Sequence, residues 1–391
     1  MMNGETQSQT NWVGAWYAAP SRMFSANLSG RTLRQIVHLH AGGTQLRLRL
    51  SNRYGDAPVT LSSLSVGPVL QGSVALPGVQ AVWFAGQPTV TLEPGQDVVS
   101  DPVSLHVKAF SDLALTFFLA QGESLTGHMS AQQTSYVSGP GDVTAVPAEA
   151  SFFVYPLQTL SWWLITGIDV VPSLPLNAVV AFGSSTTEGF GSTPNANRRW
   201  PDYLARRLRD AGETRCMSVL NAGIGGNQLT SSEMPLAGGM PPFLFGEAGS
   251  TRLAWDALTQ PGATDLILHI GSNDLRGGVP GATVIEALQH VASQARQTYR
   301  RVFGTTILPG GYPPTQVEQR SLVNTWLREQ GRQWFDAIFD LSTPLASSDD
   351  EAVLHPACDS GDGMHPNDEG YRRMAEAIEI NALTGTPSRK A

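Results

Sequence analysis

Lysine and cysteine are both scarce in this sequence of 391 residues. The only lysines are Lys108 and Lys390 and the net charge is -8, so we expect no basic surface for nucleic acid. The 2 cysteines, Cys216 and Cys358, exclude a disulfide framework and lack the spacing of a metal site. No apolar run approaches the ~18 residues that a membrane helix needs. These absences favour a globular protein that has neither nucleic acid nor a membrane as a partner.

The amino-terminal stretch MMNGETQSQT lacks the basic start and the apolar run of a secretory signal. We therefore expect a cytoplasmic protein from the sequence as written, or a secreted or periplasmic one if a leader has been removed. At ~150 residues per domain, the length favours two domains.

The first half of the chain has the pattern of β-strands. In LRLRL at residues 46–50, apolar and polar side chains alternate strictly, as in a strand with one buried face. Together with turn-forming residues between the runs, the pattern predicts strands at 46–50, 59–66, 79–84, 103–107, 113–119 and 162–170. We therefore expect an all-β sandwich or jelly-roll domain at residues 1–171. Pro172 and Pro175 mark its end, because proline forces extended backbone before it.

In the second half, segments with the pattern of β-strands alternate with segments that have the apolar face of a helix. Strands are predicted at 178–182, 218–221, 266–270, 302–308 and 337–341, and helices at 200–211, 284–295, 317–329 and 369–378. Repeated strand-then-helix units indicate a parallel sheet with helices on both faces. Residues 172–391 are therefore predicted to form an α/β domain.

Small and polar residues follow three of these strands. Loops at the carboxyl ends of parallel strands bind ligands, so the segments after Phe182, Asn221 and Ile270 are expected to be neighbours. They carry Ser184-Ser185, a glycine-rich segment at 221–227, and Gly271-Ser272-Asn273-Asp274, and Asp362-Gly363-Met364-His365 precedes the last helix.

These loops supply the parts that acyl transfer by a serine requires: a base, a carboxylate that orients it, and donors for an oxyanion. Asp362 and His365 are three residues apart across a turn, so the carboxylate can hold one ring nitrogen. Gly226 lacks a side chain and can bring its N–H close to a ligand. Asn273 offers an amide donor from the next strand end.

The four loops resemble the four blocks of the SGNH (GDSL-type) esterase family. GSSTT stands at the G-D-S-x-T block, NAGIGGN at the glycine block, GSND at G-x-N-D, and DGMHP at D-x-x-H-P. The blocks occur in family order over residues 177–383. The stretch 188–201 is also similar to a branch of bacterial arylesterase/acylhydrolases that carries an amino-terminal β-rich domain. The resemblance implies a flavodoxin-like SGNH hydrolase domain after the β-sandwich.

The resemblance also implies roles for five residues. Ser185 would be the nucleophile, His365 the general base and then acid, and Asp362 the carboxylate that orients it. The backbone N–H groups of Ser185 and Gly226, with the Asn273 side chain, would form the oxyanion hole. The family scheme needs no cofactor and no metal.

Ser184 is a departure from the family, which has Asp before the serine nucleophile. A neutral hydroxyl makes weaker hydrogen bonds than a carboxylate, so a contact that holds the nucleophile loop would be weakened. The change also places two serines side by side, and the block alignment favours Ser185 over Ser184 as nucleophile.

The leading functional hypothesis is a serine esterase that forms an acyl-enzyme on a small-molecule or carbohydrate ester. The branch resemblance suggests short-chain acyl or acetyl esters of carbohydrates or aryl alcohols. Two alternatives remain open: an acyltransferase with the same triad, and a catalytically lapsed carbohydrate-binding protein. Dinucleotide binding is disfavoured because Gly223-Ile224-Gly225-Gly226 lacks the G-x-G-x-x-G spacing.

Several other features have two interpretations each. Residues 231–250, which include Met234, could form an acyl-pocket wall or lid, or a packed surface loop. Arg198 and Arg199 could meet an acidic substrate, although surface positions at a helix start are expected. His128 could face the cleft, whereas structural roles are expected for His38, His40 and His290.

Overall fold

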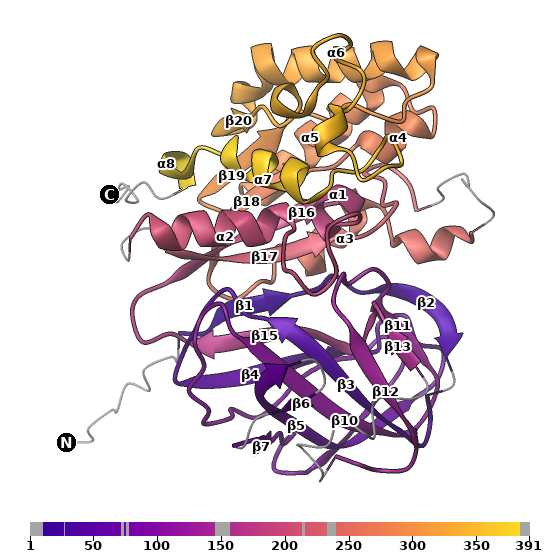
Figure 1. The fold of residues 1–391 in the computed structure, drawn as a ribbon, viewed down its shortest axis with the longest axis vertical. Helices are drawn as coiled ribbons and strands as arrows, with labels where there is room; N and C mark the ends of the chain where they lie inside the picture. Colours follow the sequence, from indigo (N-terminus) through magenta and orange to yellow (C-terminus); the bar gives the residue numbers. More distant parts are fainter. Residues whose placement is uncertain are drawn as a thin grey trace.

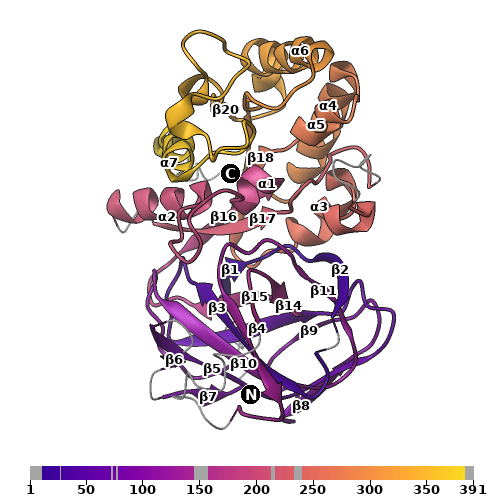
Figure 2. The same ribbon diagram turned by 45° about the vertical axis from the view of Figure 1, so that its right-hand side comes forward.

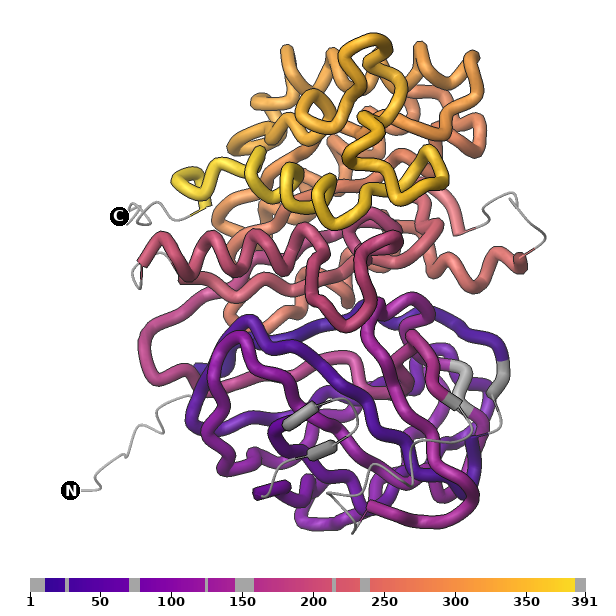
Figure 3. The backbone as a smooth tube through the Cα atoms, viewed as in Figure 1, coloured from indigo at the N-terminus to yellow at the C-terminus, as the bar shows by residue number. Residues whose placement is uncertain are grey.

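The computed structural model describes residues 11–26, 28–71, 74–75, 78–144, 157–212, 216–232 and 240–383. The first half of the chain forms a β-rich part and the second half an α/β part stacked upon it (Figures 1 and 3). The irregular segment 172–176, which holds both prolines of the predicted joint, connects the two parts.

The β-rich part is antiparallel throughout its named strands. Its strands are β1 Val13–Tyr17, β2 Ser21–Ala26, β3 Arg31–His38, β4 Gln45–Ser51, β5 Val59–Gln71, β6 Val74–Ala75, β7 Gln80–Ala81, β8 Thr89–Leu92, β9 Asp97–Val99, β10 Asp112–Gln121, β11 Ser124–His128, β12 Ser135–Pro140, β13 Leu157–Thr159, β14 Trp162–Trp163 and β15 Ile165–Val171. They form sheets in the orders β1-β15-β4-β9, β13-β12-β3-β10-β5-β6 and β14-β11-β2. Leu48 of β4 and Leu115 of β10, from the two larger sheets, share one buried core. This is the predicted all-β sandwich.

Two of the predicted strands in this part are wrong. Within 79–84 only β7 is a strand, and residues 103–107 make only the isolated bridges Leu46↔Val103 and Gly43↔Val107. Val103 and Val107 are buried all the same. The alternation in the sequence therefore reports which side chains face the core, and it does not report continuous pairing of the backbone.

The α/β part contains a five-stranded sheet in the order β17-β16-β18-β19-β20, and all four strand pairs are parallel. Its elements are β16 Asn177–Gly183, α1 Ser185–Glu188, α2 Trp200–Asp210, β17 Met217–Gly223, the 3-10 helix η3 Pro242–Phe245, α3 Gly249–Asp256, β18 Ala263–His269, α4 Ser272–Arg276, α5 Gly281–Ala295, β19 Arg301–Thr305, α6 Pro314–Gln330, the 3-10 helix η4 Gly331–Gln333, β20 Ala337–Phe339, the 3-10 helices η5 Thr343–Leu345 and η6 Pro356–Cys358, α7 Asp368–Glu376 and α8 Ile380–Leu383. Every predicted strand and helix of this half is present, with bounds within three residues of the prediction.

Successive residues of β16 pack on opposite faces of the sheet because side chains alternate along a strand. Val180 and Phe182 join a buried cluster that includes residues of α3, α5 and α6. Val179 and Ala181 join another that includes residues of α2 and α7. Helices therefore cover both faces, as predicted, with α2 and α7 on one side and α3, α5 and α6 on the other (Figure 2).

Strand β1 lies between the two parts, and all five of its residues are buried. Ala15 and Trp16 belong to the core of the sandwich, whereas Val13 and Tyr17 belong to a core cluster of the α/β part. Ala18, just past β1, makes a parallel bridge to Asn221 of β17. Strand β1 thus contributes side chains to the hydrophobic core of each part.

Candidate active site

The carboxyl ends of three strands come together at one edge of the α/β sheet. Gly183 at the end of β16 is in register with Gly223 of β17 and with His269 of β18. The loops that follow these strands are therefore neighbours, as the sequence predicts.

Ser185 and His365 meet at this edge although 180 positions separate them in the chain. Ser185 is the first residue of α1 and directly follows the extended Ser184. Its Oγ lies 2.9 Å from Nε2 of His365. Nδ1 of the same ring lies 2.6 Å from Oδ2 of Asp362. An ionised carboxylate only accepts hydrogen bonds, so Nδ1–H donates to Asp362 and Nε2 is left to accept the Ser185 hydroxyl hydrogen.

Backbone contacts hold Asp362 in place. Its Oδ1 accepts the N–H of His365 at 2.8 Å and that of Met364 at 2.9 Å. Burial acts to raise its pKa, but the hydrogen bonds from the His365 ring and from the two N–H groups lower the pKa to about 2. Burial lowers the pKa of His365 below its ordinary value, and Asp362 opposes this. At neutral pH Asp362 is therefore ionised and His365 is a neutral base.

Asp359, a residue that the sequence did not single out, holds the preceding turn of the same loop. Its Oδ1 accepts the N–H of Gly361 at 2.8 Å and that of Gly363 at 3.0 Å. Asn367 closes the loop by accepting the Gly370 N–H at 3.0 Å, which caps α7.

The glycine segment, residues 221–227, can accept only glycine at position 226. The φ of Gly226 is +70°, a left-handed conformation that other residues rarely adopt. A Cβ there would lie 2.2 Å from the Phe245 ring. The Asn273 amide donates to the Asn227 carbonyl at 3.0 Å, so it lies against the residue that follows Gly226. An amide has two N–H hydrogens, and this bond uses one of them.

Asp274 fixes the chain just beyond the glycine segment. It is fully buried, and its two oxygens accept the N–H of Leu229 at 2.7 Å and that of Thr230 at 2.8 Å. The Thr230 hydroxyl adds a third bond at 2.7 Å. Asp274 thus ties the loop after β18 to the loop after β17.

If Asn273 is an oxyanion donor, Asn273→Ala should lower kcat by about 10²–10³-fold with little change in KM. The bond to the oxyanion forms only in the transition state, so substrate binding loses little. Steady-state kinetics with a chromogenic ester measure both constants. An equal loss in Asp274→Asn, which weakens the loop contacts but keeps the amide of Asn273, would mean that loop packing is responsible.

Aromatic side chains border the triad. Phe190 lies on His365, with ring centroids 4.7 Å apart, and is 44% exposed. In the segment 231–250, residues 233–239, including Met234, lie outside the described residues. Phe245 from this segment packs on Gly226, and the exposed Phe243 contacts Phe24 of β2 edge to face at 6.0 Å. The described part of the segment therefore borders the oxyanion loop on one side and the β-rich part on the other.

Ser184 is buried and makes backbone contacts that start α1. Its carbonyl accepts the N–H groups of Thr187 and Glu188, both at 2.9 Å. The hydroxyl that bonds His365 is that of Ser185. The geometry thus favours the assignment that the block alignment gave.

Arg252 is a buried residue that the sequence analysis missed. It lies on α3, within a stretch that was not predicted as a helix, and its side chain is 0% exposed. It donates to the carbonyls of Gly183 at 2.8 Å and Ala222 at 3.0 Å, and to Oδ1 of Asn227 at 2.9 Å. Its charge is paired with Asp256 at 2.9 Å. Arg252 therefore ties the end of β16 to the glycine segment.

The expectation that Arg199 lies on the surface is wrong. Its side chain is buried and bonds Asp202 at 2.6 Å, and Nη1 donates to the Ala131 carbonyl of the β-rich part at 3.0 Å. Arg198 is half-exposed and pairs with Asp368 at 2.8 Å. His40 is buried with Nε2 3.0 Å from Asp202. Asp202 lies three residues after Arg199, but Ala131, His40 and Asp368 come from distant segments, so little in the sequence signals those contacts.

Within the described ranges, no group of three or more His, Cys, Asp or Glu side chains is arranged to hold a metal ion. No described helix combines the length and the apolar character needed to cross a membrane.

Comparisons with known proteins give one family match and several similar solved structures. Residues 181–373 match the GDSL-like lipase/acylhydrolase family. A G-D-S-L family protein from Desulfitobacterium hafniense DCB-2 is 20% identical, with a TM-score of 0.40, over 53% of this chain and 99% of its own. A family two carbohydrate esterase from Clostridium thermocellum, solved with cellohexaose, is 13% identical, with a TM-score of 0.40, over 94% of both chains.

A GDSL-like lipase from Bacteroides thetaiotaomicron VPI-5482 is 16% identical, with a TM-score of 0.37, over 54% of this chain and 86% of its own. Among curated proteins, none matches this chain significantly. The four sequence blocks, the parallel sheet with helices on both faces, and the family match lead to one assignment: residues 181–373 are a domain of the GDSL-like lipase/acylhydrolase family, also called SGNH hydrolases.

Proposed function

We propose that the protein is a serine esterase that hydrolyses short-chain acyl or acetyl esters of carbohydrates or aryl alcohols through an acyl-enzyme. The observation that carries the proposal is the chain of contacts from Ser185 Oγ to His365 Nε2 at 2.9 Å and from His365 Nδ1 to Asp362 at 2.6 Å. A hydroxyl, a neutral base and an ionised carboxylate in this order can deliver an activated serine oxygen.

In the first step Ser185 Oγ attacks the ester carbonyl while His365 Nε2 takes its proton. The resulting oxyanion would accept hydrogen bonds from the N–H groups of Ser185 and Gly226 and from the Asn273 amide. The carbon–oxygen bond then breaks, and His365 returns the proton to the leaving alcohol. In the second step His365 takes a proton from water, which attacks the acyl-enzyme and releases the acid and Ser185.

The Phe190 ring beside His365 supports an aryl or sugar alcohol as the leaving group. His365 delivers its proton to the leaving oxygen, so the leaving alcohol lies on the side of that ring. The exposed Phe190 ring, which lies on His365, offers an apolar surface on which an aryl group or a sugar ring can pack.

A substrate panel tests the proposal. We expect p-nitrophenyl acetate and butyrate, and acetylated sugars, to be hydrolysed with higher kcat/KM than p-nitrophenyl octanoate. Acid release should exceed acyl transfer to an added alcohol. Dominant transfer would indicate an acyltransferase, and sugar binding without turnover of any ester would indicate the lapsed carbohydrate-binding protein.

A further inference from the structure

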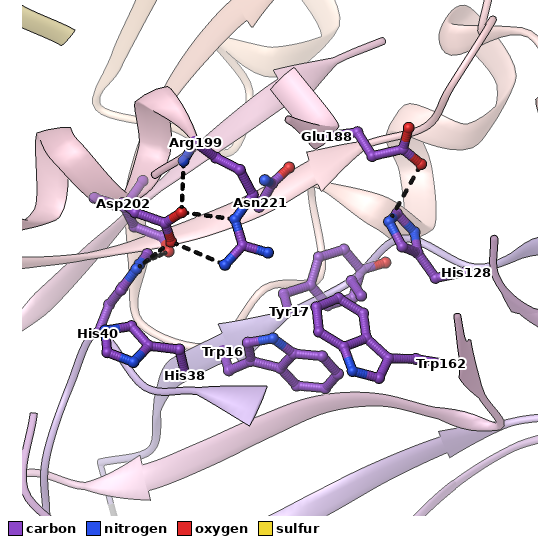
Figure 4. Close-up of a pocket in the computed structure, with 12 residues that line it drawn as sticks. Trp16, Tyr17, His38, His40, His128, Trp162, Glu188, Arg199, Asp202 and Asn221 are labelled. Carbon is purple, nitrogen blue, oxygen red and sulfur yellow. Dashed lines mark hydrogen bonds and ion pairs between the residues drawn. The ribbon is translucent and has the colours of Figure 1, made fainter. Parts of the chain in front are cut away.

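A small cavity, lined by aromatic and by charged side chains, lies between the β-rich part and the α/β part. It measures about 20 Å³ and is bordered by Trp16, His40, His128, Glu188, Arg199 and Asp202 (Figure 4). This volume holds about one water molecule. The cavity is therefore too small for a substrate, and the charged side chains around it act on one another.

His128 of β11 and Glu188 of α1 face each other across this boundary (Figure 4). Their side chains are 8% and 2% exposed, and Nε2 of His128 lies 3.3 Å from Oε1 of Glu188. Nδ1 of His128 lies 2.9 Å from the Ala19 carbonyl oxygen, which can only accept, so Nδ1 carries a hydrogen. In the neutral ring Nε2 is then an acceptor, and a protonated Glu188 can donate to it across this contact of 3.3 Å.

Glu188 also lies against the glycine segment. A Cβ at Gly223 would lie 2.2 Å from the Glu188 backbone nitrogen, and a Cβ at Gly225 would lie 2.8 Å from Glu188 Oε2. The close approach of the backbone therefore requires glycine at position 223, and a side chain at position 225 would displace the Glu188 carboxyl. The Asn221 amide adds a bond of 2.8 Å to the Thr187 carbonyl. The last turn of α1 and the segment before Gly226 are thus in direct contact.

We propose that Glu188, held by His128 of the β-rich part, is a positioning residue that sets the distance between the Ser185 and Gly226 N–H groups of the oxyanion hole. Ser185 and Glu188 are the first and last residues of α1, and Gly225 directly precedes Gly226. A shift of the Glu188 carboxyl therefore moves one side of the oxyanion hole relative to the other. The inference rests on the proposed function, and it makes the β-rich part a component of the catalytic apparatus.

The protonation of the pair agrees with this geometry. Burial raises the pKa of Glu188 to about 8, although the Gly225 N–H and Arg252 oppose the rise. Burial lowers the pKa of His128 to about 4. The other ionisable groups near Glu188 are Arg252 on α3 and Tyr371 on α7, and around the cavity lie Tyr17, His38, His40, Arg199 and Asp202. Burial keeps the pKa of Tyr371 well above 10.

At pH 7 both members of the pair are therefore neutral, and Glu188 keeps the proton that it can donate to His128. As the pH rises through about 8, Glu188 loses its proton and can no longer donate to His128. The wild-type kcat is then expected to fall on the alkaline side with an apparent pKa of about 8. A glutamine at this position cannot ionise and still donates through its amide.

The experiment compares Glu188→Gln and Glu188→Ala with the wild type in the full chain. We expect Glu188→Ala to lower kcat by about 10–10²-fold with KM nearly unchanged. A misplaced N–H donor of the oxyanion hole weakens the binding of the transition state and leaves the binding of the substrate unchanged. Binding of phenylboronic acid, which forms a tetrahedral adduct on Ser185, should weaken by the same factor. Glu188→Gln should keep kcat within about threefold at pH 7 and should lack the alkaline decline.

Gln260→Leu is the matched control. Gln260 accepts a hydrogen bond of 2.8 Å from Arg49 of the β-rich part, just before β18 begins, at the opposite edge of the sheet. It should lower the melting temperature without changing kcat or boronate binding. The inference is overturned if Glu188→Ala keeps wild-type kcat and boronate affinity, or if Gln260→Leu loses as much kcat as Glu188→Ala.

If Glu188→Ala does not fold, the pH profile of Glu188→Gln decides: an alkaline decline equal to that of the wild type overturns the inference. Ser185→Ala distinguishes this failure from failure of the proposed function. Full activity of Ser185→Ala contradicts the esterase mechanism itself, whereas an inactive Ser185→Ala with an unaffected Glu188→Ala contradicts the positioning role alone.

Discussion

Ser185→Ala is expected to lower kcat for ester hydrolysis by about 10⁴-fold or more, because it removes the oxygen that becomes acylated. The remaining rate would come from the oxyanion hole and substrate binding. Ser184→Ala should keep kcat within about tenfold, since the Ser184 backbone, rather than its hydroxyl, makes the contacts that start α1. Initial rates with p-nitrophenyl acetate measure both.

Circular dichroism and the melting temperature serve as controls, because both serines lie at a buried strand end and a folding defect would also lower activity. The opposite pattern, with Ser184→Ala inactive and Ser185→Ala active, would assign the nucleophile to Ser184. It would also mean that the 2.9 Å contact between Ser185 and His365 does not report the catalytic arrangement.

Arg252→Met is expected to destabilise the protein by about 3–5 kcal/mol. The variant leaves the buried Asp256 without its cation and removes the donor to the Gly183 carbonyl. Asp256 keeps a hydrogen bond of 2.7 Å from the Tyr17 hydroxyl, but a hydroxyl cannot neutralise the charge. Equilibrium unfolding in urea at pH 8 measures the free energy of unfolding.

Two further variants show whether the unpaired charge is the cause. Arg252→Met/Asp256→Asn should recover part of the loss, because the second change removes the charge. Arg296→Met breaks the half-exposed pair with Asp336 and should cost about 1 kcal/mol or less. If Arg252→Met and Arg296→Met lowered the free energy of unfolding equally, the unpaired buried charge of Asp256 would not be the cause.

Burial raises the pKa of Asp256, although Arg252 opposes it. Without Arg252 the carboxyl therefore takes up a proton more readily in the folded state than in the unfolded chain. A raised pKa of an acid favours the folded state at low pH. The loss of stability in Arg252→Met should accordingly be smaller at pH 5 than at pH 8.

The α/β half could be predicted closely from the sequence because its strands are short apolar runs and its helices have a clear apolar face. Val179 to Phe182 are all apolar because both faces of β16 are covered, so a continuous run marks a buried parallel strand. The parallel order then places the ends of neighbouring strands together. For this reason the positions of Ser185 and Asn273 at one sheet edge followed from the pattern alone.

The contacts between the two halves could not be predicted in the same way. His128 ends β11, which was not among the strands predicted from the sequence, and no pattern along the chain marks its partner, Glu188. Arg252 is one cation in a stretch without a motif, and its partners come from two different strand ends. A pattern along the chain reports burial and period, whereas a buried ion pair depends on how distant segments dock.

The central claim is that the Ser185 oxygen, activated by His365, is the nucleophile. Incubation of the active protein with a fluorophosphonate ester, followed by peptide mass spectrometry, tests it most directly. The account predicts one phosphonyl group per chain on Ser185, no adduct in Ser185→Ala, slow labelling in His365→Ala, and normal labelling in Ser184→Ala. An adduct on Ser184, or active folded protein that remains unlabelled, would contradict it.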